Sequence, residues 1–210
     1  MLYDISPTLS ASTPVYPGDQ PFTLTATAAL AAGAEANVSA LTTTTHVGAH
    51  VDAPLHTEAG ARAIADLPLE IFLGPCRVLA VPAAELIEPE HLADLGIGDP
   101  PRLLLKTSSV EECGRFPAAF TAISPAGAEL LATRGLLLVG LDTPSVDPPG
   151  STSLPAHHIL AGRGVVLLEG VVLESVPPGL YELIALPLKL AGGDASPVRA
   201  VLRSLPRADT

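Results

Sequence analysis

The chain has 210 residues and a mass of 21.4 kDa, a length that suits one large domain or at most two small ones. Its net charge is −11, because 22 acidic residues outnumber 11 basic ones, and such a surface repels nucleic-acid phosphates and anionic membranes. Apolar residues make up 48% of the chain and charged residues 16%, so we expect a packed core and no disordered chain.

Nothing in the sequence indicates insertion into a membrane or export. The longest apolar runs, Leu136–Leu141 and Val165–Leu173, fall short of the roughly 20 residues that a membrane span needs. The first residues, Met-Leu-Tyr-Asp, do not have the basic and apolar pattern of a signal peptide. Cys76 and Cys113 are too few for a disulfide framework. We therefore predict a cytoplasmic protein with no membrane or nucleic-acid partner, in which neither thiol has a role.

The first elements in the chain have the period of strands. Phe22–Thr27 and Val38–Thr44 alternate apolar and polar residues, which predicts two half-buried strands. Short apolar runs bounded mostly by Gly or Pro predict further, buried strands, at Arg77–Val81, Arg102–Lys106, Leu136–Leu141, Val165–Leu173 and Leu180–Leu186. The Pro177–Gly179 turn separates the last two runs.

Three short helices are expected between these strands. Ser124 is a candidate N-cap for a helix that starts at Pro125 and stops at Gly135. Pro89–Leu95 and Pro155–Ala161 are the other two candidates. With about seven or eight strands, the sequence predicts a single α/β domain over residues 1–210, with a central mixed β-sheet or barrel flanked by short helices.

Five of the six histidines lie in two short segments, which are His46-Val-Gly-Ala-His50-Val-Asp52-Ala-Pro-Leu-His56 and the pair His157-His158. Imidazole and carboxylate groups suit zinc, iron or manganese. The residue after His46 is Val, so the general-base Glu of a helical metalloprotease motif is missing. Because Gly48 and Pro54 disfavour a helix, we predict a loop that leaves the Val38–Thr44 strand and curls around an ion.

Glu169 interrupts an otherwise apolar run, Val-Val-Leu-Leu-Glu-Gly-Val-Val-Leu. A buried carboxylate without a partner costs several kcal/mol, so it needs a cation or a metal ion. The chain has only 11 Lys and Arg residues to supply a cation. A metal ion is therefore the favoured partner.

The pattern His-x-Gly-x-His-x-Asp-x-Pro-x-x-His resembles the signature of the metal-dependent cyclase-like amidohydrolases. Within that superfamily the chain is similar, almost from end to end, to the bacterial kynurenine formamidases. The blocks that carry this second resemblance are Asp4–Ser6, Thr13–Asp19, Gly140–Pro148, Ala156–His158, Leu168–Gly170, Tyr181–Leu188 and Asp194–Ala200. The resemblance implies a fold of the swivelling β/β/α type, a homodimer, and two metal ions per subunit, zinc or else manganese.

The resemblance also implies a role for each residue of the site. His46, His50 and Asp52 would hold the first ion, and Asp52 would share the second ion with His157 and Glu169. His56 would be the catalytic acid/base, since its ordinary pKa near 6.5 suits proton transfer. From the residues alone, a role for His56 as a further metal ligand stays open.

Tyr16 occupies the position at which the formamidases have Trp, a residue that contacts the aromatic substrate. Tyr keeps a stacking face and adds a hydroxyl group. The implied reaction is hydrolysis of N-formyl-L-kynurenine to L-kynurenine and formate, in tryptophan breakdown through kynurenine. Because Tyr replaces Trp, hydrolysis of another cyclic or N-acyl amide is the alternative. A third hypothesis is a metal that only stabilises the fold.

Other hydrolase and nucleotide-binding motifs are missing from the sequence. It has no Gly-x-Ser-x-Gly elbow of a serine hydrolase and no P-loop. The remaining polar residues of these segments are interpreted more simply: His91 as a surface residue, His158 as a surface or supporting residue, Asp142 and Asp147 as turn-stabilising residues, and Ser196 and Arg199 without an assigned role.

Overall fold

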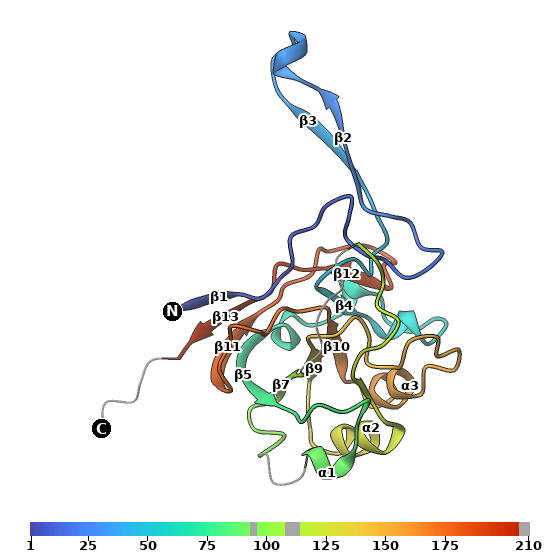
Figure 1. The fold of residues 1–210 in the computed structure, drawn as a ribbon, viewed down its shortest axis with the longest axis vertical. Coiled ribbons are helices and arrows are strands. Elements are labelled where there is room, and N and C mark those ends of the chain that lie inside the picture. Colours follow the sequence, from blue (N-terminus) through green and yellow to red (C-terminus); the bar gives the residue numbers. More distant parts are fainter. Residues whose placement is uncertain (93–95, 108–113, 206–210) are drawn as a thin grey trace.

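A computed structural model describes residues 1–92, 96–107 and 114–205. Its centre is a nine-stranded sheet in the order β1-β13-β11-β5-β7-β9-β10-β4-β12 (Figure 1). In that order the strands are Leu2–Asp4, Val201–Ser204, Gly179–Ile184, Leu73–Ala80, Arg102–Lys106, Leu138–Leu141, Val166–Glu169, His50–Asp52 and Ala195–Pro197. Strands β5, β7, β9 and β10 are parallel and the other pairs are antiparallel. The predicted single α/β domain with a mixed sheet is confirmed, and the sheet is open, with β1 and β12 at its edges.

Three helices lie on one side of this sheet: α1 (Pro89–Leu92), α2 (Pro125–Ala132) and α3 (Pro155–Ala161) (Figure 1). Strand alternation separates two cores. Leu103, Leu105 and Leu167 belong to the cluster that includes Leu131 of α2 and Leu160 of α3. Leu104 and Leu168 belong to the cluster on the opposite face of the sheet. No helix within the described residues is long and apolar enough to cross a bilayer.

The short elements complete the layer around α1 and α2. Strands β6 (Leu86–Ile87) and β8 (Ala122–Ile123) form a separate parallel pair. Single 3-10 turns occur at Leu30–Ala32, Pro54–His56, Ile64–Asp66 and Leu69–Ile71.

Several predicted boundaries are confirmed. The strand Arg102–Lys106 and the helix Pro155–Ala161 have the predicted ends. Ser124 caps α2, since its hydroxyl oxygen accepts a hydrogen bond from the Gly127 N–H at 3.0 Å. Of the predicted helix Pro89–Leu95, residues 89–92 are helical, while 93–95 and Cys113 lie outside the described residues.

The prediction of two half-buried strands near the N-terminus is wrong in its burial. Strands β2 (Thr23–Ala28) and β3 (Val38–Thr42) pair as an antiparallel hairpin, but every residue except Ala28 is exposed. We call residues 23–42 the hairpin arm, which projects away from the sheet (Figure 1). Leu24 and Leu41 lie opposite each other and are 64% and 57% exposed. The alternation of apolar and polar residues along β2 and β3 is present, but the described part of the chain leaves the leucine side chains of this hairpin exposed.

The prediction of a loop at the histidine cluster is wrong for His50–Asp52, which form β4. This strand is paired on both sides, with β10 and β12, and its three residues are buried. Sequence analysis missed it because three residues are too few to show a period, and it missed β1, β6, β8, β12 and β13, which have two to four residues, because they are similarly short. The described residues accordingly contain 13 strands rather than seven or eight.

Candidate metal centre

The register of two short strands brings the first site residues together. His50 and Asp52 lie on the same face of β4, while Val51, between them, packs into the core on the other face. Glu169, the last residue of β10, lies directly opposite His50. Consequently His50 Nε2 lies 3.4 Å from Glu169 Oε2 and 3.6 Å from Asp52 Oδ1.

Helix α3 adds a third side to the cluster. Its residue His157 is buried, and its Nε2 lies 3.6 Å from Asp52 Oδ2 and 3.4 Å from Glu169 Oε1. Residues from β4, β10 and α3 thus converge on one buried point, on the face of the sheet that the helices cover.

His46 and His56 approach the same point from the segments that flank β4. His46 Nδ1 lies 3.1 Å from Asp52 Oδ1. The ring centre of His56, at the end of the 3-10 turn Pro54–His56, lies 4.3 Å from that of His46 and 5.5 Å from that of His157. All six residues predicted as metal ligands or acid/base therefore lie in one cluster, and their individual roles stay predictions.

This cluster fits a divalent cation by its donor chemistry. Both carboxylate oxygens of Asp52 are buried, and within the described residues neither accepts a hydrogen bond of good geometry, although His46 Nδ1 lies 3.1 Å from Oδ1. Two ligand groups within it could hold an ion, His46–Asp52–His56 and His50–Asp52–Glu169, and Asp52 belongs to both. His, Asp and Glu are the donors that zinc and manganese accept. Because His56 belongs to the first group, its role as a ligand stays open beside acid/base catalysis.

The carboxylates of the cluster raise the pKa values of three of its histidines. Burial alone would lower the pKa of His46, but Asp52 and Asp194 outweigh it and raise the pKa to about 9. In the same way Glu169, Asp147 and Asp52 outweigh burial and raise the pKa of His157 to about 10. The pKa of His50 is also raised against burial, by Glu169 and Asp52. A site that attracts protons this strongly also attracts metal cations, which compete for the same ring nitrogens.

His56 differs from the other histidines of the cluster. Burial lowers its pKa, and the neighbouring rings of His46 and His157 act in the same direction. Burial outweighs the opposing effect of the Asp52 and Glu169 carboxylates, and the lowered pKa favours the neutral imidazole, the state that a general base requires.

Asp147 supports the cluster, a role that the sequence analysis did not assign. It is almost fully buried, and one of its oxygens lies 2.6 Å from Nδ1 of His157. It also accepts hydrogen bonds from the backbone N–H groups of Ala156 (3.0 Å) and His157 (3.1 Å) at the start of α3. The interpretation of Asp147 as a turn-stabilising residue is therefore incomplete. With Nδ1 held by Asp147, the Nε2 atom of His157 faces Asp52 and Glu169.

Asp194 is a second residue of the site that sequence analysis missed. Its carboxylate lies 2.9 Å from His46 Nε2 and 3.6 Å from His56 Nδ1, and it accepts a hydrogen bond from the Thr45 hydroxyl (3.0 Å). The only signal was its place at the start of the block Asp194–Ala200, which carries part of the resemblance. The contact could not be predicted from the sequence, because His46 and Asp194 are 148 residues apart in the chain.

Two glycines allow the chain to pass close to the cluster. Gly170 follows Glu169 with φ +66°, and a Cβ there would lie 2.4 Å from the carbonyl oxygen of Gly48. Gly48 itself has φ +59°, and a Cβ there would meet the Leu9 side chain at 2.5 Å. A larger residue at 170 would push the end of β10, with Glu169, away from the Gly48 backbone, while at 48 the positive φ disfavours any other residue.

The cluster opens into a cavity of about 640 Å³. Tyr16, Phe116 and Phe120 form one aromatic wall, with ring centres 5.4 Å apart for the first pair and 6.1 Å for the second. Tyr16, the predicted substrate contact, thus lines the cavity and is 48% exposed. Sequence analysis missed Phe116 and Phe120, because single aromatic residues in a loop follow no period.

The remaining residues singled out in the sequence lie outside the cluster. His91 accepts a hydrogen bond from the Glu88 N–H, and His158 is exposed on α3. Arg199 pairs with Asp4, and the buried Ser196 hydroxyl bonds to the backbone of Leu188 and Pro197. The Asp142 carboxylate accepts the Thr107 N–H, and burial raises its pKa to about 6.

Solved structures of two proteins share the fold over nearly the whole chain. One, described as a potential metal-dependent hydrolase with cyclase activity, is 29% identical, with a TM-score of 0.84 over 96% of both chains. The other, a predicted metal-dependent hydrolase from Bacillus stearothermophilus, is also 29% identical, with a TM-score of 0.83 over 96% of this chain and 97% of that one. Isatin hydrolase A from Ralstonia solanacearum has the same fold at 21% identity, with a TM-score of 0.76 over 96% of this chain and 91% of that one.

A family model described as "Putative cyclase" matches residues 3–148. This range covers most of the chain and includes the segment from His46 to His56, β4 and the Asp147 loop. The chain therefore belongs to the cyclase family.

Proposed function

We propose that this protein is a cytoplasmic, metal-dependent amidohydrolase that converts N-formyl-L-kynurenine to L-kynurenine and formate. The observation that carries the hydrolase assignment is the buried Asp52, whose oxygens lie among three histidines and Glu169, donors suited to a metal ion, beside an aromatic-walled cavity. The hydrolases named among the structural relatives support the same reaction class.

Five side chains of the cluster are proposed as ligands for two metal ions. His46, His50 and Asp52 would hold one ion, and Asp52, His157 and Glu169 a second. When bound, such ions polarise a carbonyl oxygen and lower the pKa of water toward about 7. The protein holds these ligands in place before the substrate arrives, so little reorganisation is needed during the reaction.

His56 is the residue that moves the proton. Its Nδ1 faces Asp194, and Nε2 is therefore the ring nitrogen assigned to exchange protons with the reactants. The neutral ring accepts a proton as water adds to the formyl carbon, and then donates it to the leaving nitrogen when the C–N bond breaks. Asp194 keeps the ring oriented and stabilises the imidazolium that forms between these two steps.

The aromatic wall supports an aromatic substrate. Tyr16 and Phe116 offer ring faces and edges on which an aryl amide packs, and such ring pairs contribute about 0.5–1.5 kcal/mol beyond buried area. Isatin, the cyclic aromatic amide named for several structural relatives, is the second candidate substrate. Both substrates remain candidates, because Tyr16 replaces the Trp that contacts the aromatic substrate in the formamidases.

Turnover of a small panel tests the assignment. The purified protein is assayed with N-formyl-L-kynurenine, isatin and an aliphatic formamide, before and after chelation and after readdition of Zn²⁺ or Mn²⁺. We expect the formylated aryl amine to be hydrolysed, with activity lost on chelation and restored by metal. Preferential opening of isatin would move the substrate to the cyclic amide, and metal binding without any turnover would favour a structural metal.

The proposed partner is a second copy of the chain, bound through the hairpin arm. Neither strand of the arm has a charged residue, and an isolated two-stranded ribbon is at best marginally stable in water. Covering Leu24 and Leu41 with another subunit would bury the apolar surface that the described part of this chain leaves exposed. Sedimentation velocity should give twice the chain mass of 21.4 kDa, whereas a monomer would contradict the dimer.

A further inference from the structure

The cavity has an unusual balance of charge beyond the metal ligands. Apart from Glu169, its acidic lining residues are Asp19 and Asp194, and no described lining residue is Lys or Arg. Asp194 is already engaged by His46 and Thr45. Asp19 therefore stands as the one carboxylate of the lining without a cationic or histidine partner among the described residues.

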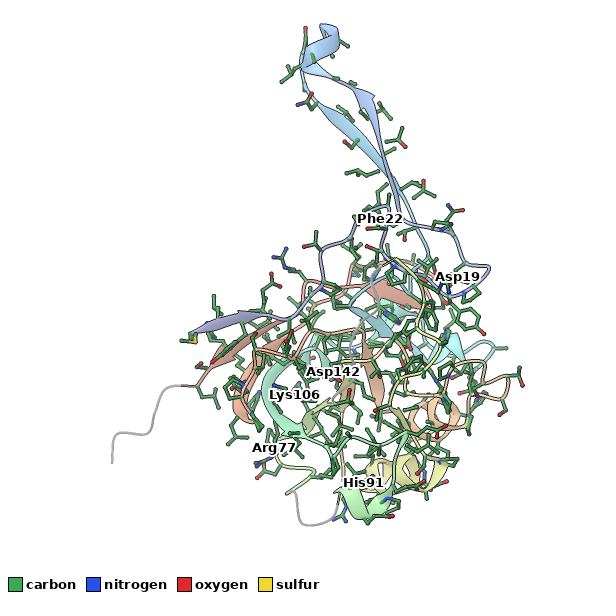
Figure 2. The ribbon with its side chains drawn as sticks, viewed as in Figure 1. Asp19, Phe22, Arg77, His91, Lys106 and Asp142 are labelled. Atoms are coloured by element: carbon green, nitrogen blue, oxygen red, sulfur yellow. The ribbon has the colours of Figure 1, made fainter. Side chains whose placement is uncertain are left out.

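Asp19 is held in a defined place by its neighbours. Its Oδ2 accepts a hydrogen bond from the Thr44 hydroxyl (3.2 Å), and the Thr44 oxygen lies 3.4 Å from the backbone nitrogen of His46. Its own N–H donates to the carbonyl of Tyr16 (3.0 Å), which closes a tight turn with Gly18 at φ +102°. A single turn thus presents the ring of Tyr16 and the carboxylate of Asp19, and Thr44 links that turn to the metal centre. Figure 2 shows Asp19 on the loop that precedes the hairpin arm.

We propose that Asp19 binds a primary ammonium group on the substrate, so that the preferred substrate is an aryl amide with a cationic tail. This inference rests on the proposed function, since it assumes that the scissile amide lies at the metal centre and the aromatic ring against Tyr16. A hydrogen bond to a charged group changes affinity by about 10- to 100-fold, enough to select among otherwise similar amides.

The same charges act against a carboxylate on the tail. A substrate carboxylate close to Asp19 would be repelled, because the described lining holds no Lys or Arg to neutralise it. An amino-acid tail can still bind, with its ammonium group on Asp19 and its carboxylate directed to solvent. Removing that carboxylate should therefore not weaken binding, whereas removing the amine should.

Binding of the deformylated products tests this selectivity without any reaction. Three ligands share the aryl ketone: kynurenamine has only the ammonium group, ortho-aminoacetophenone has no charged tail, and the deaminated analogue of kynurenine has only the carboxylate. We expect calorimetry on the purified protein to show kynurenamine binding about 10- to 100-fold more tightly than the neutral ketone, with the acid weakest.

Variants assign the effect to one carboxylate. Asp19→Asn should abolish the preference for kynurenamine while leaving the affinity for the neutral ketone unchanged, which also shows that the cavity is intact. Asp19→Glu should restore part of the preference, and Asp66→Asn, an exposed change outside the cavity lining, should leave it unchanged.

The results separate this inference from the proposed function. Equal affinities of the wild-type protein for the three ligands, no binding of any of them, or an equal loss for all in Asp19→Asn would overturn the role of Asp19. If the preference for the amine holds but no formylated aryl amine is hydrolysed, the proposed reaction is wrong and the ammonium site stands.

Discussion

The candidate metal centre and the hairpin arm both depart from the usual burial pattern of a folded protein. The first buries charged side chains, and the second exposes apolar ones. At the centre, Asp52 and Glu169 are buried carboxylates within a sheet. On the arm (Figure 1), Leu24 and Leu41 are exposed side chains on two strands that have no charged residue. Buried polar groups normally have partners, and large apolar surfaces are normally covered. Each departure therefore motivates one of the two proposed partners, a cation inside the domain and a second copy of the chain outside it.

The two regions also differ in how firmly the rest of the chain holds them. Strand β4 has neighbours on both sides, and α3 packs over it through His157, so the ligands are fixed by the fold. Among the described residues, the hydrogen bonds of the arm lie within the arm itself and are chiefly those that pair β2 with β3. Changes at the centre should accordingly affect chemistry, and changes on the arm should affect assembly alone.

The largest effect is expected for Asp52→Asn, which removes the carboxylate common to both ligand groups. Metal bound per chain should fall, and turnover should drop at least about 1,000-fold, because the ions supply several kcal/mol of transition-state stabilisation. Elemental analysis and rate measurement on the same sample check this. Asp66→Asn, on the surface, is the control, and full metal content in Asp52→Asn would refute the shared-ligand assignment.

Asp147→Asn should have the next largest effect. The amide can still accept from the backbone of α3 but holds the His157 ring less well, so metal affinity should fall about 10- to 100-fold. Competition with a chromogenic chelator measures this affinity. Asp142→Asn is the matched control, since Asp142 lies at the end of β9, just before the same loop, and bonds to Thr107 rather than to a histidine. Equal affinities in both variants would mean that Asp147 only stabilises the turn.

On the arm, the double change Leu24→Ser and Leu41→Ser should weaken the dimer and leave metal content unchanged. Losing two apolar side chains from an interface should raise the dissociation constant at least about 100-fold, as measured by sedimentation equilibrium. Thr25→Ser, on the opposite face of the ribbon, should leave it unchanged. An unchanged dissociation constant in the double variant would place the interface elsewhere.

The smallest effect is expected for Ser124→Ala, remote from both regions. Loss of the cap on α2 should lower the free energy of unfolding by about 1 kcal/mol, as read from denaturant titration. Metal content and oligomeric state should stay the same. A loss of metal in this variant would mean that general destabilisation, rather than a lost ligand, explains the effects at Asp52 and Asp147.

Sequence reasoning succeeded where local signals were strong. The cap at Ser124 and the buried strand Arg102–Lys106 follow from residue type and short-range pattern alone. The grouping of His46, His50 and Asp52 was likewise visible, because these residues are close in the chain.

It failed where long-range pairing decides the structure. Three residues of β4 form a strand only because β10 and β12 lie beside them, and Asp194 reaches His46 across 148 residues. The prediction that β2 and β3 are half-buried failed for a related reason. An alternating pattern shows that one face of a strand is apolar, but it does not show which molecule covers that face.

The most direct test is a calorimetric titration of the chelator-treated protein with Zn²⁺, repeated with Mn²⁺, followed by thermal unfolding of the loaded and metal-free samples. A metal centre at Asp52 predicts saturable binding of about two ions per chain and a higher melting temperature in the loaded sample. An absence of binding, with identical melting curves, would contradict it and leave Asp52 and Glu169 with the neighbouring histidines as their partners in place of a metal ion.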